Sequence, residues 1–579
     1  MSDEEQINNS AEVSFIWNSK EILRDTYKRH QYMDIILPFV VLRRIESVLL
    51  EERERIEKQM EKGLKKLSPQ DAKKIVSVQV ISSIGFDNKS KFTFKTLASE
   101  KETSIKENFR SYINGFTENI KNILEKFGIL NELNKLEHDK LLYLLIKQYA
   151  ELDLSPRIIS SNKMGYIFEE LIRDFSELTG EEAGEHFTPR EIIQLMVRIL
   201  IDEDEIKSKE LKSIYDPACG TDGMLVIAKD YILKRINSEA NVIVYGQEKQ
   251  PETWAVGASD MFLKGEEADN IKYGNTLTDD QLPNETFDYQ LSNPPFGVDW
   301  KKDKPAISRD ATKRFPNKML PRVSDGATLF LMHMISKMKP VSEGGSSIAI
   351  VFNGSPLFTG DAGSGESEFR KFLLENDLVE VIIALPPDLF YNTNIKTYVW
   401  IIRNNKKKVR KGKVQLINAV EFYEKMRNLG KKTKYISKDQ IEKIYEIYDA
   451  FKESEHCKIF DNSDFGYTRV SLELTDVDEE GNPKNETVMK KVKGKMVEVT
   501  REVKINDEEY VPLKEDINEF LKKEVEKPFK IKNKVVGYEI NFTQYFYKYV
   551  SLRKQEEVIK EFQELEKENK ELLKELVLL

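Results

Sequence analysis

The sequence predicts an α/β protein, in which a doubly wound, mostly parallel sheet follows an all-α N-terminal domain and precedes a C-terminal helical tail. Three observations predict this class. Apolar residues recur at helical spacing up to about residue 155, short β-rich runs alternate with helical stretches over 156–420, and a heptad repeat lies at 558–579. The 579 residues also imply several domains, because one hydrophobic core rarely grows past about 250–300 residues.

The N-terminal region, residues 1–155, is predicted to be a helical domain. Its apolar residues, among them Ile16, Leu23 and Tyr27, fall at intervals typical of one helix face, and few strand-like runs interrupt them. The highly charged stretch 51–66 has the composition of a solvated helix face.

Residues 156–420 are predicted to form the sheet. The β-rich runs lie at 212–216, 241–246, 287–293, 346–353, 378–386 and 397–404. Their alternation with helical patterns predicts βα units. Because ligands of such sheets bind at the carboxyl ends of the strands, the residues directly after these runs are the first candidates for a site.

The C-terminal part is predicted in two pieces, a mixed region at 421–545 and a helix at 546–579. Within the first piece, the charge-rich stretch 474–509 favours an irregular hairpin or extended arm. In the second, apolar residues step by four and three with a polar Asn569 at an a position, which is typical of a coiled coil. An amphipathic helix packed on its own domain is the alternative, and spacing leaves both open.

Composition limits the class of protein. The net charge is −9, from 90 Lys and Arg against 99 Asp and Glu, which argues against a chain that wraps nucleic acid with its whole surface but leaves a local basic cleft possible. Two cysteines, Cys219 and Cys457, give no disulfide framework or cysteine-rich zinc module, and no metal site is predicted. The start is acidic and polar, and no apolar run reaches the roughly 20 residues of a membrane span. We therefore expect a cytoplasmic protein.

The run 214–233 predicts a strand, a glycine-containing turn and a helix. Asp216 ends the strand, and Gly220 and Gly223 allow the backbone to turn tightly and approach a ligand. The turn is neither a G-x-G-x-x-G fingerprint nor a P-loop, so neither a nicotinamide nor a nucleoside triphosphate is indicated. A cofactor turn and a plain structural junction both remain open.

Two further strand ends carry candidate residues. Glu248 follows the second run, where an acidic side chain could accept hydrogen bonds from ribose hydroxyls, although a surface glutamate is the alternative. The segment Asn293, Pro294, Pro295 and Phe296 follows the third run. Proline lacks a backbone donor, so this turn offers rigid acceptors beside an aromatic face on which a base could stack.

The sequence DPACGTDG at 216–223 followed by NPPF at 293–296 resembles the S-adenosylmethionine-dependent amino-methyltransferases, in the gamma-class order of the N6-adenine DNA enzymes. Four more stretches, 17–46, 184–197, 381–405 and 537–558, are similar to the modification (methyltransferase) subunit of type I restriction-modification systems. The resemblance implies a Rossmann-like methyltransferase sheet and methyl transfer to N6 of a flipped-out adenine in double-stranded DNA, which protects host DNA. Methylation of RNA or of a protein glutamine, or an inactive scaffold, stays open as an alternative.

The resemblance also implies a set of cofactor-binding residues. They are Glu185, His186, Phe187, Thr188, Pro189, Arg190, Asp216, Ala218, Gly220, Thr221, Asp222, Gly223, Glu248, Asn275 and Leu277. Two of them depart from the family pattern, since Asp222 stands where glycine is usual and Asn275 where aspartate is common. A carboxylate at 222 would either cap the following helix or disfavour a positive φ. The residues Thr188 to Glu191 also fit a helix cap with a capping box, so a purely structural helix start is the alternative there.

In the implied mechanism, the Asn293 side-chain oxygen and the Pro294 carbonyl accept the two amino hydrogens of adenine, and Phe296 stacks on the ring. No covalent intermediate is needed, so Cys219 is expected to be a small buried thiol.

Two basic clusters could contact DNA. Residues 300–324 carry eight basic and two acidic side chains directly after NPPF, and we predict DNA contacts from Lys301, Lys302, Lys304, Lys313 and Arg314. The second cluster, 403–413, is more consistent with a solvated face.

No recognition module, Walker A lysine or nuclease cluster is evident in the sequence. The resemblance assigns those tasks to a specificity subunit, with two modification subunits for each, and to a restriction/translocase subunit. The C-terminal heptad is then predicted to dock on the specificity subunit.

Overall fold

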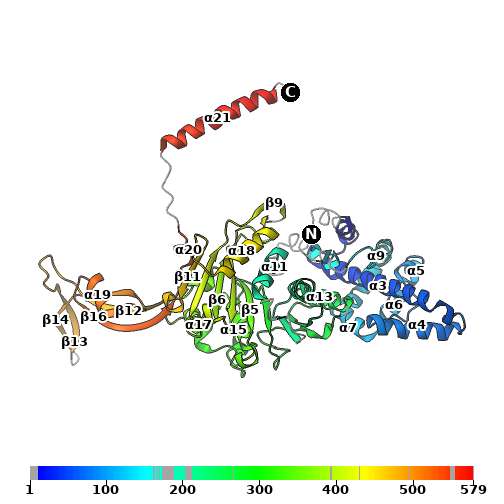
Figure 1. Ribbon diagram of the computed structural model, residues 1–579, viewed down its shortest axis with the longest axis horizontal. Coiled ribbons are helices and arrows are strands. Elements are labelled where there is room, and N and C mark those ends of the chain that lie inside the picture. Colours follow the sequence, from blue (N-terminus) through cyan, green and yellow to red (C-terminus); the bar gives the residue numbers. More distant parts are fainter. Residues whose placement is uncertain are drawn as a thin grey trace. The chain divides into compact units, whose positions relative to one another are not determined.

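The computed structural model describes residues 11–160, 163–165, 167–168, 170–172, 188–201, 206, 211–264, 266–391, 394–429, 431–492, 495–547 and 555–577 (Figure 1). The chain divides into two compact units, Met1–Ile540 and Asn541–Leu579. The predicted boundaries at 155, 420 and 545 within this scheme stay predictions. The predicted cofactor residues Glu185, His186 and Phe187 lie outside the described residues, as does Leu579 of the heptad.

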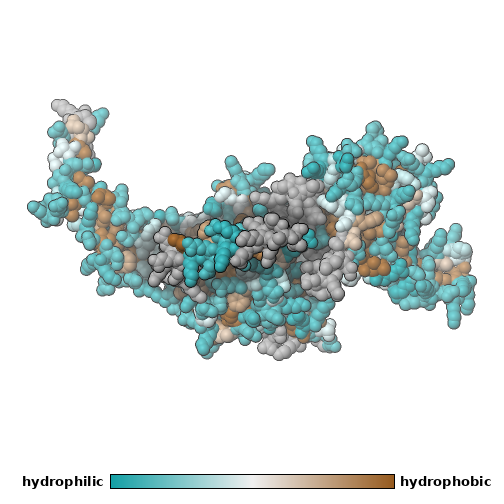
Figure 2. All heavy atoms as spheres, turned by 90° about the horizontal axis from the view of Figure 1, so that it is seen from above, coloured by the Kyte–Doolittle hydropathy of each residue, from teal (hydrophilic) through white to brown (hydrophobic). Residues whose placement is uncertain are grey.

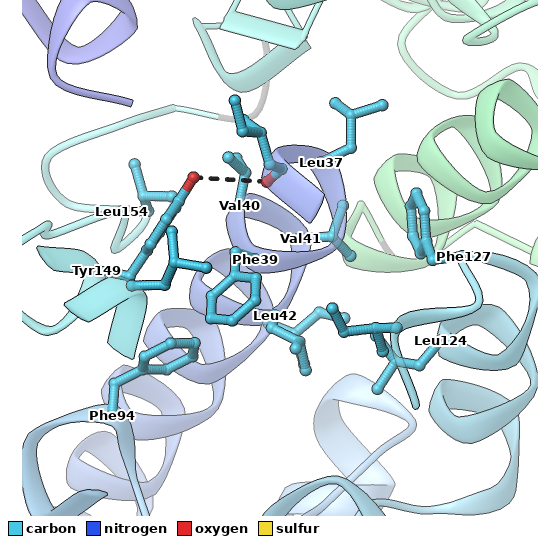
Figure 3. Packing of buried hydrophobic residues seen from close by; sticks show 14 of the residues in the cluster. Leu37, Phe39, Val40, Val41, Leu42, Phe94, Leu124, Phe127, Tyr149 and Leu154 are labelled. Carbon is cyan, nitrogen blue, oxygen red and sulfur yellow. Dashed lines mark hydrogen bonds between the residues drawn. The ribbon is translucent and has the colours of Figure 1, made fainter. Parts of the chain in front are cut away.

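The N-terminal region is helical, as predicted. Its helices are α2 (Ser19–Leu23), α3 (Met33–Leu64), α4 (Pro69–Ile84), α5 (Phe94–Ala98), α6 (Ile105–Asn114), α7 (Glu118–Lys126), α8 (Ile129–His138) and α9 (Leu141–Ala150), with single turns η1 (Arg29–Gln31) and η2 (Glu102–Ser104). Phe39 of α3 lies at the centre of their core, 5.5 Å from the ring of Phe109 and 5.3 Å from that of Tyr149. Figure 3 shows Tyr149 and Phe94 converging on it from other helices.

The helical region packs directly on the sheet domain through α13 (Pro251–Leu263). This helix contacts α3 and α7, and its Ala255 and Val256 belong to the N-terminal hydrophobic core. The Phe86 and Phe262 rings lie 5.4 Å apart at this contact. Apolar side chains such as Val78 and Leu144 stay exposed on the N-terminal helices, which show apolar patches on a mainly hydrophilic surface (Figure 2).

The central sheet has nine strands in the described residues, in the order β11-β8-β6-β7-β5-β4-β1-β2-β3. They are β1 (Leu211–Asp216), β2 (Asn241–Glu248), β3 (Ile271–Tyr273), β4 (Tyr289–Ser292), β5 (Ser347–Asn353), β6 (Val379–Ala384), β7 (Thr397–Arg403), β8 (Lys413–Asn418) and β11 (Cys457–Asp461). The run β3-β2-β1-β4-β5 is parallel, and β7 lies antiparallel between β5 and β6. All six predicted strands are present, whereas the short β3 and the strands β8 and β11 were not predicted.

Helices cover both faces of the sheet, which is why its central strands are apolar throughout. On one face lie α11 (Arg190–Leu200), α12 (Gly223–Tyr231) with its π-helical extension η5 (Ile232–Ile236), and α18 (Lys438–Ala450). On the other lies α15 (Ala327–Ser336), because Tyr215 and Gln290, which alternate with the residues facing α11, hydrogen-bond to it. The other helices and single turns of this region are α14 (Lys304–Ile307), α16 (Ser355–Phe358), α17 (Gly365–Glu375), η6 (Ala268–Asn270), η7 (Asn317–Met319), η8 (Val341–Glu343), η9 (Lys408–Arg410) and η10 (Asn462–Phe465).

The stretch 474–509, predicted as an irregular hairpin or extended arm, contains a regular hairpin and part of a three-stranded sheet. Strand β12 (Gly466–Thr475) pairs with β15 (Lys504–Pro512) and β16 (Phe529–Tyr538), and β13 (Asn485–Val492) pairs with β14 (Lys495–Glu502) in a separate hairpin. Val470 and Leu472 of β12 pack on Leu521 of α19 (Ile517–Glu524). The charged side chains of β15 are exposed and concealed its strand character, while β12 supplies its backbone partners. A further hairpin joins β9 (Glu424–Leu429) and β10 (Lys432–Tyr435).

The second unit contains α20 (Phe542–Tyr545) and α21 (Gln555–Val577). The helix predicted from the heptad is therefore present, and the apolar Ile559, Phe562, Leu565 and Leu572 are exposed on it. Its pairing as a coiled coil stays a prediction. Among the described residues, no helix combines the length and apolar character needed to cross a membrane.

Candidate active site

The carboxyl ends of β1, β2 and β4 meet around one pocket, as the strand order requires. Asp216, Glu248 and Asn293, predicted from three separate stretches, all line it. The described lining residues are Thr188, Ile193, Asp216, Pro217, Ala218, Cys219, Gly220, Thr221, Gly223, Met224, Glu248, Lys249, Gln250, Asn275, Thr276, Asn293, Pro295, Val298 and Phe330. The structure thus brings together the first glycine turn, the acidic residue and the NPPF element.

The turn after β1, residues 216–223, is held by two carboxylates; we call it the cofactor turn. Asp216 accepts a hydrogen bond from the Ala218 N–H (2.9 Å), and Glu248 accepts one from the Gly220 N–H (3.0 Å) and another from the Gln250 N–H (2.7 Å). Gly220 has a φ of 57°, which its missing Cβ permits. Glu248 therefore fixes the cofactor turn to the end of β2 while it lines the pocket.

Two glycines that sequence reasoning missed make room for this turn. A Cβ at Gly246 of β2 would lie 2.8 Å from Sγ of Cys219, and one at Gly257 of α13 would lie 2.5 Å from Oδ2 of Asp222. Both distances are closer than real contacts of this kind. Gly246 was visible in the sequence, but its close approach to Cys219 was not. Burial raises the pKa of the Cys219 thiol well above its usual range, which agrees with a structural role.

Asp222 neither caps the following helix nor lines the pocket. Its φ is 65°, so the positive φ that favours glycine is present, and its side chain forms no cap hydrogen bond to α12. The side chain is fully buried against α13, away from the lining of the pocket, and neither carboxyl oxygen has a hydrogen-bond partner in the part of the chain that the structure describes. Burial raises its pKa well above the usual range, which favours the neutral form of the group.

We call the turn after β4, residues 293–297, the target turn. In contrast to the paired N–H groups of the cofactor turn, it holds a side-chain acceptor that has no partner among the described residues. Asn293 is 7% exposed, lines the pocket, and its Oδ1 has no hydrogen-bond partner among the described residues. Pro294 and Pro295 bring no N–H groups that could occupy this oxygen. Phe296 is partly exposed at the edge of the core, and Gly297, with a φ of 66°, donates its N–H to Asp325 (3.2 Å).

Burial also changes the acidity of the pocket, because it raises the pKa of Asp216 to about 7. A cationic ligand beside this carboxyl would favour its charged form.

Comparison with known proteins agrees with this geometry. The chain matches the family described as N-6 DNA Methylase over residues 159–485, more than half of its length, and the HsdM N-terminal domain over residues 13–148. It belongs to the N-6 DNA methylase family.

Proteins similar to this chain are named methylase or methyltransferase subunits of type I restriction systems. The chain is 27% identical to the type I restriction enzyme MjaIX methylase subunit of Methanocaldococcus jannaschii, over 76% of this chain and 77% of that protein. It is 30% identical to the type I restriction enzyme HindI methylase subunit of Haemophilus influenzae, over 50% of this chain and 61% of that protein. A type I restriction-modification methyltransferase subunit from Streptococcus thermophilus has the same fold, with a TM-score of 0.63, 22% identity, and coverage of 79% of this chain and 97% of that one.

For an N-6 DNA methylase with this strand order, the cofactor is S-adenosylmethionine. The pocket fits it, because acidic Asp216 and Glu248 suit its cationic and hydroxyl groups, and Ile193, Met224 and Phe330 supply apolar walls.

The remaining predicted cofactor residues differ in their positions. Thr188 and Asn275 line the pocket, and the Asn275 side-chain oxygen accepts from the Leu277 N–H (3.1 Å). Leu277 is buried and Arg190 lines a neighbouring cavity instead. Helix α11 begins at Arg190 after Pro189, with no side-chain cap.

The predicted capping box at the start of α11 is therefore absent. The reason is a tertiary contact, since Glu191 forms a buried ion pair with Lys432 of β10 and does not turn back to the helix start.

In this N-6 DNA methylase, the two basic clusters have different structures. Lys301, Lys302, Lys304 and Lys313 are exposed, whereas the Arg314 side chain is 8% exposed and points inward, which disfavours the DNA contact predicted for it. In the second cluster, Arg403 and Arg410 are buried beside Glu380 and Lys406 pairs with Asp377, which explains much of that cluster as structural.

Proposed function

We propose that this chain is the modification subunit of a type I restriction-modification system and transfers a methyl group from S-adenosylmethionine to N6 of adenine in double-stranded DNA. One observation carries the proposal. Asn293 lines the same pocket as Asp216 and Glu248, and its buried Oδ1 has no hydrogen-bond partner among the described residues. An acceptor without a partner is costly unless a ligand supplies the donor.

S-adenosylmethionine supplies an electrophilic methyl group on a sulfonium when bound. The chain's own task is to prepare the adenine amino nitrogen, whose lone pair is delocalised into the ring. The Asn293 Oδ1 and the Pro294 carbonyl accept the two amino hydrogens, which favours a lone pair localised on nitrogen and directed at the methyl group. The nitrogen becomes positively charged as its bond to the methyl group forms, and one of the two amino hydrogens then leaves as a proton to solvent. Positioning and electrostatics carry the rate, and no side chain forms a covalent intermediate.

The target base must leave the duplex to reach this turn, because its amino group is otherwise paired inside the helix. Phe296, partly exposed beside Asn293, offers a face for the flipped base, and such stacking stabilises by about 1–3 kcal/mol per base. Lys301, Lys302, Lys304 and Lys313 are exposed on the loop that follows and fit contacts to the DNA backbone.

The cofactor would be held from the other side of the pocket. Glu248 is placed to accept from ribose hydroxyls, and Asp216 would face the cationic part of the molecule. Of the residues predicted from the family resemblance, Ala218, Gly220, Thr221, Gly223 and Asn275 also line the pocket and would complete the site.

A specificity subunit is the expected partner, because the relatives are methylase subunits of larger restriction enzymes. Helix α21 offers a docking seam, since Phe562, Leu565 and Leu572 recur at heptad positions and are exposed. Two modification subunits for each specificity subunit, and a separate restriction subunit, complete the proposed assembly. Deleting 555–577 should weaken co-purification with the specificity subunit, and unchanged co-purification would contradict this role.

The test of the function is expression with and without the specificity partner, followed by single-molecule sequencing of the DNA for N6-methyladenine. We expect a methylated motif only in the paired sample. A complex that binds S-adenosylmethionine yet leaves no mark on DNA would overturn the proposal, and assays with RNA and protein would then test the alternative substrates.

A further inference from the structure

The loop that follows the target turn is closed on itself. We call residues 300–324 the basic loop. Its ends are joined by hydrogen bonds from the Trp300 N–H to the Val323 carbonyl (3.0 Å) and from the Gly326 N–H to the Val298 carbonyl (3.1 Å). The loop is therefore tied together directly beside the target turn, and its exposed face carries the lysines assigned above to DNA.

Arg314 is the one residue of the predicted DNA set whose side chain turns inward, where it joins the basic loop to the pocket wall. Its Nε donates to Asp310 of the same loop (3.0 Å). Its two terminal nitrogens donate to the backbone carbonyls of Thr276 (3.0 Å) and Leu277 (3.3 Å). Thr276 lines the cofactor pocket and its hydroxyl donates to the Pro217 carbonyl (2.6 Å) in the cofactor turn. One guanidinium thus spans the DNA side and the cofactor side.

We call the Arg314 guanidinium and its contacts the bridge. A buried histidine contacts this guanidinium as well. His333 Nδ1 lies 2.9 Å from a terminal nitrogen of Arg314, and its Nε2 lies 3.0 Å from the Tyr215 hydroxyl. A guanidinium can only donate, so Nδ1 accepts and the ring proton is on Nε2. Burial and the neighbouring cations lower the pKa of His333 well below its usual range, which keeps the ring neutral. Tyr215 precedes Asp216 in β1, so the bridge is anchored to the strand that carries the cofactor turn.

The charges around the bridge balance. Arg314 lies 3.7 Å from Asp280 as well as 3.0 Å from Asp310, and Lys337 lies 2.7 Å from Asp280. All four side chains are at most 11% exposed. A buried network of this kind fixes geometry, because removal of one member leaves another charge without compensation.

We propose that Arg314 is a positioning residue that couples binding of target DNA at the basic loop to binding of the cofactor in the pocket. The inference rests on the proposed function. DNA bound to the basic loop restricts the position of Asp310. The hydrogen bond between Asp310 and Arg314 then orders the guanidinium, which in turn holds the carbonyls of Thr276 and Leu277 in the pocket wall. Because such coupling is reciprocal, the cofactor strengthens DNA binding by the same factor.

The decisive substitution is Arg314→Lys. A lysine keeps the positive charge but cannot serve Asp310, two carbonyls and His333 together, since it lacks the planar fork of donors. Asp310→Asn is a second variant that weakens only the loop end of the bridge. Arg370→Lys is the matched control, because Arg370 is also a buried arginine and donates to the carbonyls of Tyr538 (2.6 Å) and Thr359 (2.7 Å), apart from the pocket lining.

The experiment uses the complex with its specificity subunit and S-adenosylhomocysteine as a non-reacting probe. Calorimetry gives its Kd with and without a duplex that contains the methylated motif. We expect roughly tenfold tighter binding with DNA for the native complex and for Arg370→Lys. Arg314→Lys should abolish this ratio, and Asp310→Asn should reduce it, while both variants retain the native circular dichroism spectrum.

An unchanged ratio in Arg314→Lys and Asp310→Asn, or no coupling in the native complex, would overturn the inference. Failure of the proposed function is recognisable separately, because it appears as absence of N6-methyladenine in DNA whatever the binding ratio.

Discussion

The cofactor turn and the target turn lie at the same edge of the sheet but use their polar atoms in opposite ways. In the cofactor turn, the N–H groups of Ala218 and Gly220 are already paired with Asp216 and Glu248. In the target turn, Oδ1 of Asn293 has no partner in the described chain, and the next two residues are prolines. The first turn therefore keeps its shape without a ligand, whereas the second keeps an acceptor open for one.

This difference separates two kinds of effect. Changes in the cofactor turn should alter affinity for the cofactor, while changes in the target turn should alter the rate of transfer. Asp222 belongs to the cofactor turn but fits neither role, because its carboxyl, which has no hydrogen-bond partner among the described residues, faces α13 and not the pocket.

The largest effect is expected from Asn293→Ala. Loss of the acceptor should lower the single-turnover rate of methylation roughly 10²–10³-fold, as removal of one aimed polar group does in other active sites. Cofactor affinity should stay close to native, because Asn293 does not support the cofactor turn. Asn293→Asp keeps an acceptor oxygen and should lose less. A near-native rate for Asn293→Ala would break the distinction between the turns.

A smaller effect is expected from Glu248→Gln. The amide keeps one acceptor oxygen but presents its NH2 donor toward either the Gly220 or the Gln250 N–H, so at least one charge-assisted hydrogen bond is lost, at a cost of about 1.5–3 kcal/mol. The Kd for S-adenosylmethionine should rise about tenfold or more, with little change in the rate at saturation. A rate loss at saturating cofactor, with unchanged Kd, would contradict the assignment.

The pKa of about 7 for Asp216 predicts a pH dependence of cofactor binding. Below pH 7 the buried carboxyl holds a proton that a cationic cofactor must displace, so affinity should increase between about pH 6 and pH 8, with proton release on binding below pH 7. Calorimetry in buffers of different ionisation enthalpy measures this release. The Asp216→Asn variant should bind the cofactor more weakly and should not show this proton release. A pH profile identical to that of the native protein would exclude Asp216 as the source of the pH dependence.

The smallest effect on function is expected from Asp222→Gly. Glycine relieves a left-handed backbone that costs other residues roughly 1–2 kcal/mol, and the change removes a buried carboxyl without a partner. The free energy of unfolding should increase, and methyl transfer should persist. A loss of cofactor binding would show instead that Asp222 takes part in the site.

Much of the site could be predicted because strand ends are local features. Asp216, Glu248 and Asn293 each follow a short apolar run, and the parallel strand order brings such ends together. Arg314 could not be placed in this way, since only tertiary contacts with Thr276 and His333 turn its side chain inward, while the adjacent Lys313 is exposed.

Tertiary contacts that the sequence does not reveal also explain the other differences between prediction and structure. Glu191 had the spacing of a capping box, but a lysine from a distant strand provides a stronger partner. Strand β15 is so rich in charge that no alternating pattern revealed it, and pairing with β12 forms it nonetheless.

A structure of the complex with S-adenosylhomocysteine and a duplex that contains the methylated motif tests the role of the target turn most directly. We expect a flipped adenine whose amino nitrogen lies within about 2.7–3.2 Å of the Asn293 Oδ1, with the base against Phe296. An adenine bound elsewhere, or an Asn293 side chain turned away from its amino group, would contradict this role.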